Sequence, residues 1–173
     1  MLRISTKGEY GSRLMVYLAR RWGQGPVALA EVAANEQLPV EYLEQLAVLL
    51  RRSGLIESFR GVRGGYTLAR PPEEVHMGQV VRALEGPIAP MVCVNEGHNE
   101  MLCAFEAHCS TRLMWLRVGK AIAQALDEMT LAQLIPQPEN WEPVPVYEHG
   151  SIEEHPWLSA SVEEVKGRIQ SHG

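Results

Sequence analysis

Residues 40–69 read VEYLEQLAVLLRRSGLIESFRGVRGGYTLA, and this stretch decides the fold. Its first part has leucines at three- and four-residue spacing, which predicts an amphipathic helix over Val40–Arg52. Gly54 is expected to end that helix. The residues expected to face inward are Leu43, Leu46, Leu49 and Leu50.

Two strand-like segments follow the helix, at residues 55–60 and 65–69, with three glycines between or beside them. Glycine tolerates the positive φ of a tight hairpin tip, so the segments are expected to pair as a β-hairpin. Arg60 and Arg63 flank the tip, where their side chains suit phosphates or the negative potential of a narrow minor groove. Taken alone, the same hairpin also fits an ordinary solvated turn.

The residues before this stretch predict the other helices of a DNA-binding domain. A short helical segment at 29–35 is followed by a turn at 37–39, so two helices are joined by a turn of about four residues. This is a helix-turn-helix, and its second helix would enter the major groove of DNA. A further helix is predicted from Tyr10 to Arg21, ended by the glycines that follow.

Charge is divided unevenly along the 173 residues. Residues 1–70 carry ten Lys or Arg and six Glu, a net charge of +4, and residues 71–173 carry −9, which gives −5 for the chain. A basic first part with an acidic remainder indicates that only the first part approaches phosphate. The longest apolar run, 88–94, contains Pro90, and the N-terminus lacks the apolar core of a signal peptide. We therefore expect a cytoplasmic protein with no membrane partner.

Three longer stretches carry a resemblance to a known family: ISTKGEYGSRLMVYLA, VEYLEQLAVLLRRSGLIES and FRGVRGGYTLARPPEEVHMGQVVRALEG. They resemble the winged-helix regulators of the IscR, NsrR and RirA type. The resemblance implies a mainly α fold with a small β-hairpin wing, in which a winged helix-turn-helix domain precedes a long dimerisation helix. It further implies a homodimeric, sequence-specific transcriptional regulator that binds a double-stranded DNA operator. The alternative of an electron-transfer or enzymatic iron–sulfur protein has no nucleophile–base constellation or phosphate loop to support it, so we expect no enzymatic activity and no small-molecule substrate.

The resemblance also assigns DNA contacts to individual residues. Tyr42 and Gln45 would face base edges, and a glutamine can form a bidentate pair with adenine. The two lie three residues apart, hence on one helical face, opposite the leucines. Glu44 matches a family glutamate that influences site selection. Glu41 stands where the family often has a small polar residue, and the carboxylate of Glu41 would face phosphate or a base-edge acceptor unfavourably. The expected DNA-binding residues are Lys7, Tyr42, Glu44, Gln45, Arg60 and Arg63.

All three cysteines lie in the stretch CVNEGHNEMLCAFEAHC, which runs from Cys93 through Cys103 to Cys109. Three thiolates in one loop can hold an iron–sulfur cluster, hold structural zinc, or act as oxidisable thiols. The resemblance favours a cluster of four or two irons, because three cysteines before a long helix are the sensor layout of the family. The first gap is longer than usual in the family, and Arg112 stands where IscR-like members have a histidine.

An iron–sulfur cluster normally has four protein ligands, so one ligand must come from elsewhere. The resemblance points to Glu9, which aligns with a carboxylate that NsrR-like members supply across the dimer. His98, His108 and a small molecule or water are the alternatives. Glu9 also fits an exposed acid at a helix N-terminus, where it favours the helix dipole. A cluster-free regulator with thiols or zinc remains the alternative function.

A long helix is predicted from Thr111 to Leu134, with a heptad seam of apolar residues that suits a second copy of the chain. Packing of this seam on the winged-helix part alone is the alternative. The sequence thus predicts a DNA-binding domain at 1–86, a cluster-binding loop at 87–110, a dimerisation helix at 111–135 and an acidic, Pro-containing extension at 136–173. The seam residues are Trp115, Val118, Ile122, Ala125, Met129 and Ala132.

Overall fold

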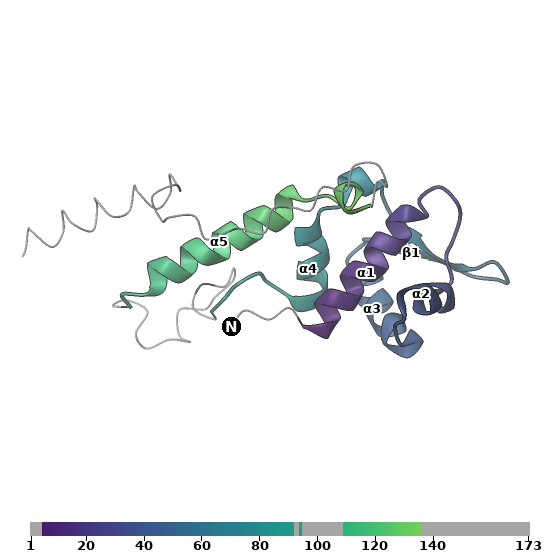
Figure 1. Ribbon diagram of the computed structural model, residues 1–173, viewed down its shortest axis with the longest axis horizontal. Helices are drawn as coiled ribbons and strands as arrows, with labels where there is room; N and C mark the ends of the chain where they lie inside the picture. The colour runs from purple at the N-terminus through teal and green to yellow at the C-terminus, as the bar shows by residue number, and fades with distance from the viewer. Residues whose placement is uncertain (1–4, 92–93, 95–108, 136–173) are drawn as a thin grey trace, which may run out of the picture. The chain divides into compact units, whose positions relative to one another are not determined.

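The computed structural model describes residues 5–91, 94 and 109–135 (Figure 1). These residues form five α-helices, a two-stranded antiparallel hairpin and two short 3₁₀ helices, which confirms the mainly α fold with a β-hairpin wing. The extension at 136–173 lies outside the described residues. None of the described helices is both long and apolar enough to cross a membrane. The elements are α1 (Thr6–Arg20), α2 (Leu29–Glu36), α3 (Val40–Arg52), β1 (Ile56–Phe59), β2 (Gly65–Leu68), η1 (Pro72–Glu74), α4 (Met77–Glu85), α5 (Arg112–Glu128) and η5 (Ala132–Leu134).

Helix α1 begins at Thr6, four residues earlier than the apolar spacing predicts. The reason is a side-chain cap: the Ser5 hydroxyl oxygen accepts hydrogen bonds from the backbone N–H groups of Lys7 and Gly8, at 3.2 and 3.4 Å. Serine at this position satisfies amides that have no partner within the helix, so it stabilises an earlier start.

The hydrophobic core lies between α1, α3 and α4 (Figure 1). Leu14 of α1 and Leu43 of α3 are fully buried there, and of the four leucines expected to face inward only Leu49 is half-buried. Gly11 lets α1 approach α4 closely, because a Cβ at Gly11 would lie 2.3 Å from the side chain of Leu84. The leucine spacing of α3 therefore builds the core that positions its opposite face.

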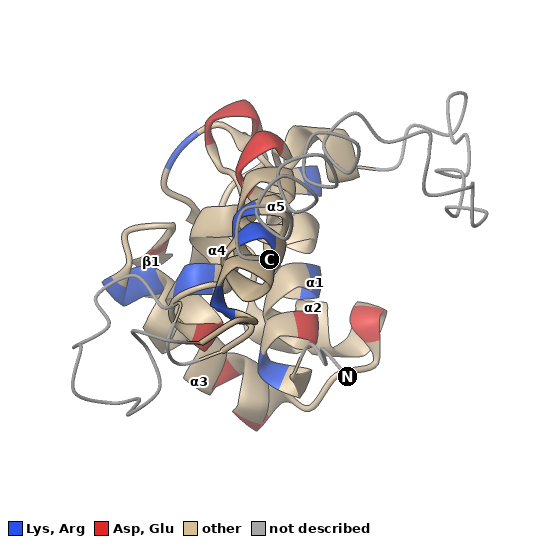
Figure 2. Cartoon of the chain, turned by 90° about the vertical axis from the view of Figure 1, so that its left-hand side faces the viewer, with Lys and Arg blue, Asp and Glu red and all other residues tan. Residues whose placement is uncertain are grey.

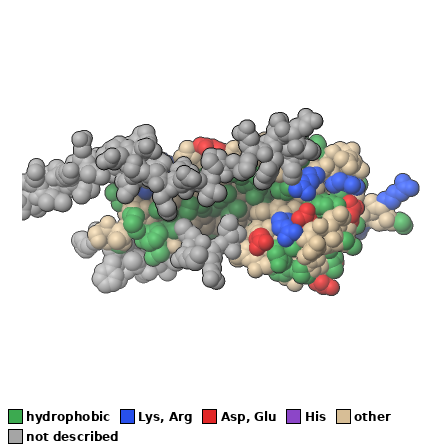
Figure 3. Space-filling model, in the orientation of Figure 1, with side chains coloured by type: hydrophobic (Ala, Val, Ile, Leu, Met, Phe, Trp, Pro, Cys, Tyr) green, Lys and Arg blue, Asp and Glu red, His purple; other side chains and the backbone are tan. Residues whose placement is uncertain are grey.

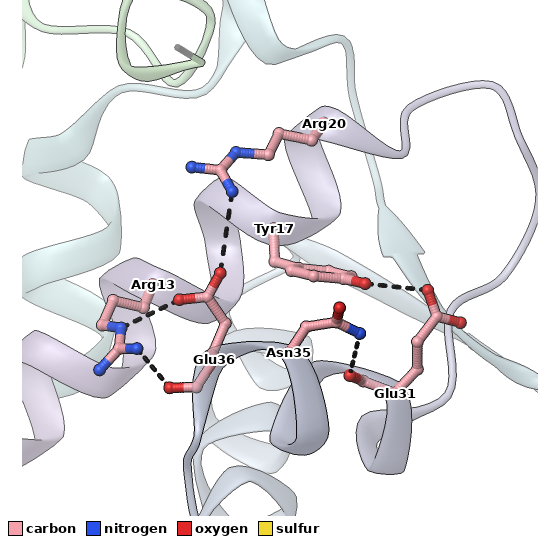
Figure 4. A network of polar contacts seen from close by, with 6 residues as sticks. All are labelled: Arg13, Tyr17, Arg20, Glu31, Asn35 and Glu36. Atoms are coloured by element: carbon pink, nitrogen blue, oxygen red, sulfur yellow. Dashed lines mark hydrogen bonds and ion pairs between the residues drawn. The ribbon is translucent and has the colours of Figure 1, made fainter.

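A polar network holds α2 against α1 (Figure 4). The Arg13 Nε–Glu36 Oε2 distance is 3.1 Å, and Arg20 Nη1 lies 3.8 Å from the other carboxylate oxygen of Glu36. The Tyr17 hydroxyl donates to Glu31 Oε1 at 2.9 Å. Burial, followed by this carboxylate, raises the pKa of Tyr17. The network fixes the first helix of the helix-turn-helix, whose second helix is α3.

The wing hairpin pairs Ile56 with Leu68 and Phe59 with Gly65. A third segment, which the sequence pattern did not indicate, pairs with it: the backbone groups of Val27 and Tyr66 exchange hydrogen bonds of 2.9 and 2.8 Å. A Cβ on Gly65 would lie 2.3 Å from the carbonyl oxygen of Val27, so glycine is required for this approach. The wing is thus attached to the segment between α1 and α2.

The predicted long helix is wrong in its extent: α5 ends at Glu128, not at Leu134. The chain becomes extended at Met129 and Thr130, since the Met77 N–H donates to the Met129 carbonyl at 2.8 Å and the Leu131 N–H donates to the Val75 carbonyl at 2.9 Å. Leu131 is fully buried in the core. Two of the six seam residues, Met129 and Ala132, therefore lie outside the helix.

Candidate nucleic-acid interface

The outer face of α3 is polar. The leucines face the core at three- and four-residue spacing, so the opposite face of the helix is left in solvent. Six α3 residues are exposed, and they lie opposite the buried leucines. Gln45 and Glu44 are among them, as expected, and so is Glu41 in the first turn. Donors and acceptors on this face suit the base edges of a major groove. The exposed residues of α3 are Glu41, Glu44, Gln45, Val48, Arg51 and Arg52.

Tyr42 differs from the expectation that it shares the open face with Gln45. Its side chain is half-buried and packs edge to face against Tyr10 of α1, with ring centroids 5.8 Å apart and an interplanar angle of 87°. Such aromatic pairs add stability beyond their buried area. The phenol ring of Tyr42 therefore also supports the start of α3 on α1.

The wing presents its two arginines at an exposed tip, at the end of the hairpin that projects to the right in Figure 1. Gly64 donates its N–H to the Gly61 carbonyl at 2.9 Å, and Gly61 has φ of +110°. This tight turn places Val62 and Arg63 at the tip, with Arg60 just before it. Basic and hydrophobic side chains are visible at that end in Figure 3.

A side-chain contact joins the recognition helix to the wing: Arg51 Nη1 donates to Ser58 Oγ of β1 at 3.3 Å. The open face of α3 and the wing therefore lie side by side. Lys7 is half-buried in the first turn of α1, well separated in the chain from both. Residues of both charges lie over α1 to α3 in Figure 2, so this interface is not a uniform basic patch.

Cys109 is the one cysteine among the described residues, and it lies just before α5. Its Sγ is 3.4 Å from Thr111 Oγ1, and it is half-exposed. Hydrogen bonding from the Thr111 hydroxyl, and then from the Thr111 backbone N–H, lowers the pKa of the Cys109 thiol below its ordinary value. The thiolate is the form that binds metals, so this residue suits a ligand of a soft metal centre.

The other expected ligands are not brought together by the described residues. Glu9 is exposed in the first turn of α1. Cys93, Cys103, His98 and His108 lie outside the described residues. In the part of the chain that the structure describes, no group of three or more His, Cys, Asp or Glu side chains is arranged to hold a metal ion.

The site also contains exposed residues that the sequence analysis missed. Val48 lies on the polar face of α3, and Phe59 and Val62 lie on the wing, and all three are exposed. The sequence signal for Val48 was present: an apolar residue falls among polar ones at helical spacing. The sequence did not indicate that Val62 lies at the tip, because this depends on which residues form the hairpin turn.

Comparisons with known proteins decide the family. The Rrf2 family model, described as an iron-dependent transcriptional regulator, matches residues 4–137. The chain belongs to the Rrf2 family. Its members include the IscR, NsrR and RirA types that the sequence resembles. It is therefore a helix-turn-helix transcriptional regulator with a winged-helix domain, and not an enzyme.

Individual relatives come from more than one branch of this family. The HTH-type regulator CymR of Bacillus subtilis is 38% identical over 133 residues, covering 77% of this chain and 89% of CymR. IscR of Aliivibrio salmonicida is 31% identical over 134 residues, covering 78% of this chain and 77% of IscR. The solved structure of B. subtilis CymR, described as the global cysteine regulator, has a TM-score of 0.64 and covers 78% of this chain and 97% of CymR. The T. potens IscR structure is 38% identical, with a TM-score of 0.62, and covers 78% of this chain and 86% of that one.

Proposed function

We propose that this protein is a cytoplasmic homodimer that binds an operator sequence-specifically, and that an iron–sulfur cluster controls this binding. The observation that supports it most is the position of Cys109 directly before α5, a helix whose apolar seam is only partly buried within the chain. A thiol suited to metal ligation then lies next to the proposed dimerisation surface. The proposed parts are the DNA-binding domain at 1–86, the cluster-binding loop at 87–110, the dimerisation segment at 111–135 and the extension at 136–173.

DNA recognition in this proposal uses α3 and the wing. Gln45 and Glu44 face base edges in the major groove, and Tyr42 contributes its ring edge and hydroxyl from the side of the same face. Arg60 and Arg63 at the exposed tip enter the minor groove or contact phosphates. Lys7, from the start of α1, contacts the backbone. Each residue here is exposed or half-buried, so no core side chain has to move.

Dimerisation uses the seam of α5. At roughly 100° per residue, Val118, Ile122 and Ala125 lie on one strip of α5. This strip is about a quarter turn from Gly119, which packs against Pro90, and about half a turn from Asp127, which pairs with Arg82 of α4. Ala125 is exposed and Val118 and Ile122 are half-exposed, although all three are apolar. Hydrophobic side chains along α5 are visible in Figure 3. A second copy is the simplest cover for such a strip.

Cys93, Cys103 and Cys109 would hold the cluster, with Glu9 of the other subunit as the fourth ligand. When bound, such a cluster supplies a centre that oxidants, nitric oxide or iron shortage can alter or remove. Glu9 is free to serve because its side chain is exposed, and its oxygen ligand exchanges more readily than a thiolate. His98 and His108 remain the competing ligands.

In this proposal, a change at the cysteine loop reaches α3 through the contacts between α5 and α4. The C-terminal end of α5 is fixed to the DNA-binding domain by the Arg82–Asp127 ion pair and by the backbone pairing around Thr130. Helix α4 in turn packs on α1 and α3. A shift at Cys109 therefore turns a helix that is anchored to the recognition domain, and changes the population of the DNA-competent dimer.

Anaerobic mass spectrometry under non-denaturing conditions tests the proposal directly. The expected species is a dimer carrying iron and an equal amount of sulfide, and Cys103→Ala should lose the cluster mass, the visible absorption and the operator response together. Glu9→Ala should weaken cluster retention more than Glu41→Ala, a matched exposed glutamate elsewhere. A Cys103→Ala protein that keeps the wild-type absorption and response would overturn the cluster assignment.

A second candidate is a cluster-free regulator that responds through its thiols or through zinc. It is favoured by the similarity to CymR, which includes a 37% identical structure of Staphylococcus aureus CymR described as its oxidized form. The lowered pKa of Cys109 suits thiol oxidation as well as ligation. The same measurement separates the two: zinc without sulfide, or a metal-free dimer whose DNA binding changes on oxidation, supports the second candidate.

A further inference from the structure

Val48 is the one apolar residue among the six exposed residues of α3, a helix that the structure describes throughout. The residue is 36% exposed, and it is not among those that pack against the hydrophobic core. A β-branched residue lowers helix propensity slightly, so the helix itself gains nothing from valine at an open position. Its chemistry therefore fits a contact made outside the fold.

The neighbours of Val48 define which surface it belongs to. Glu44, Val48 and Arg52 follow one another at four-residue steps, and Gln45 lies one turn earlier on the adjoining row. Arg51, on the other side, donates to Ser58 of the wing. Val48 thus lies between the residues proposed to read bases and the element proposed to enter the neighbouring groove.

We infer that Val48 reads thymine in the operator, through the 5-methyl group. That methyl is the apolar feature of the base edges in a major groove, where the other exposed groups are hydrogen-bond donors and acceptors. The isopropyl group of Val48, beside Gln45 and Glu44, would increase the affinity for DNA by covering the thymine methyl group. The methyl group needs no hydrogen-bond partner, so an apolar side chain suits it. The inference rests on the proposed placement of α3 in the major groove and adds one specificity-determining residue to it.

The experiment replaces each thymine of the operator, one at a time, with deoxyuridine, which lacks only the methyl. The operator is the duplex that the full-length, anaerobically purified protein selects from random sequences, and binding is measured by fluorescence anisotropy at fixed salt. The wild type should lose about fourfold in affinity at one thymine per half-site, the factor expected for uncovering one methyl-sized group. Val48→Ala should bind the thymine and deoxyuridine duplexes equally.

Val62→Ala is the matched control, because it truncates an exposed valine in the same way at the wing tip. Thymine presents no methyl group in the minor groove, so this variant should keep the wild-type sensitivity to deoxyuridine. Indifference of the wild type to every thymine methyl, or a Val48→Ala protein that keeps the sensitivity, would overturn the inference while leaving sequence-specific binding intact. Failure to select any duplex would overturn the proposed function as well.

Discussion

The winged-helix part and α5 differ in how far their apolar residues are buried within the chain. In the winged helix, the leucines of α1 and α3 are buried against one another within the chain, and the exposed face of α3 is almost entirely polar. On α5, Gly119 is the one buried residue of seventeen, although the helix carries a strip of apolar side chains. The first part has the core of an independent fold, whereas α5 has a surface that remains to be covered.

This difference separates two sources of stability. The winged helix depends on packing that exists in each single chain, so its folding does not require a partner. The seam of α5 contributes only when a partner covers it, so its residues should affect association, and the fold only through the concentration-dependent stability that dimerisation adds. Substitutions in the two regions can test this separation, and they are taken in order of expected effect.

Leu43→Ala should give the largest loss, because it leaves a cavity at a fully buried site in α3. We expect the free energy of unfolding to fall by about 2–5 kcal/mol. Urea denaturation followed by circular dichroism measures it, at one protein concentration for all variants. Leu49→Ala, on the same helix but half-buried, is the matched control and should lose clearly less. Equal losses for both would contradict the assignment of the α3 core.

Ala125→Glu should have the next largest effect, on the dimer instead of the fold. The residue is exposed in the single chain, so a carboxylate is tolerated there, but two copies facing each other would bury like charges. We expect the dissociation constant of the dimer to rise by about a hundredfold, which corresponds to ~2.7 kcal/mol. Analytical ultracentrifugation measures this constant. Lys120→Glu, at an exposed position of the same helix outside the proposed seam, should leave the dimer unchanged. A dimer that survives Ala125→Glu would place the interface elsewhere.

Local pattern predicted most of the winged helix. The leucine spacing and Gly54 gave both ends of α3, and the glycines gave the wing. The pairing of Val27 with Tyr66 and the end of α5 were missed because each depends on backbone partners about forty or more residues away. The heptad pattern continues past Glu128, yet the pairing of Thr130 with His76 and the burial of Leu131 end the helix there.

The site was predictable to a lesser degree, for physical reasons of the same kind. Side-chain type and helical spacing indicated Gln45 and Glu44, while the packing of Tyr42 on Tyr10 depends on a helix thirty residues earlier. The expected ligand Glu9 would act across a dimer, so no pattern within one chain can establish it. The resemblance to the family supplied that residue, and it stays a prediction.

Asp127→Asn should give the smallest effect and tests the joint between the two regions. Asp127 of α5 accepts a bidentate interaction from Arg82 of α4, with Nη2–Oδ2 at 2.8 Å, and this pairing lowers the pKa of Asp127 below its ordinary value of 3.8. A lowered carboxyl pKa stabilises the fold above the ordinary value, and the contribution is lost as pH falls through the folded-state value. Both side chains are partly exposed, at 31% and 45%, so solvent screening limits the contribution.

We therefore expect Asp127→Asn to lower the free energy of unfolding by about 0.5–1 kcal/mol near neutral pH. The difference between variant and wild type should shrink when the pH is brought below 3.8, because the wild-type carboxylate then begins to be protonated. Urea denaturation at both pH values measures the difference. Glu128→Gln, which removes the neighbouring exposed acid, should show no such pH-dependent difference. A pH-independent loss in Asp127→Asn would mean that Asp127 acts through its packing against Gly78, where an added Cβ would lie 1.8 Å from Asp127 Oδ1, and not through its charge.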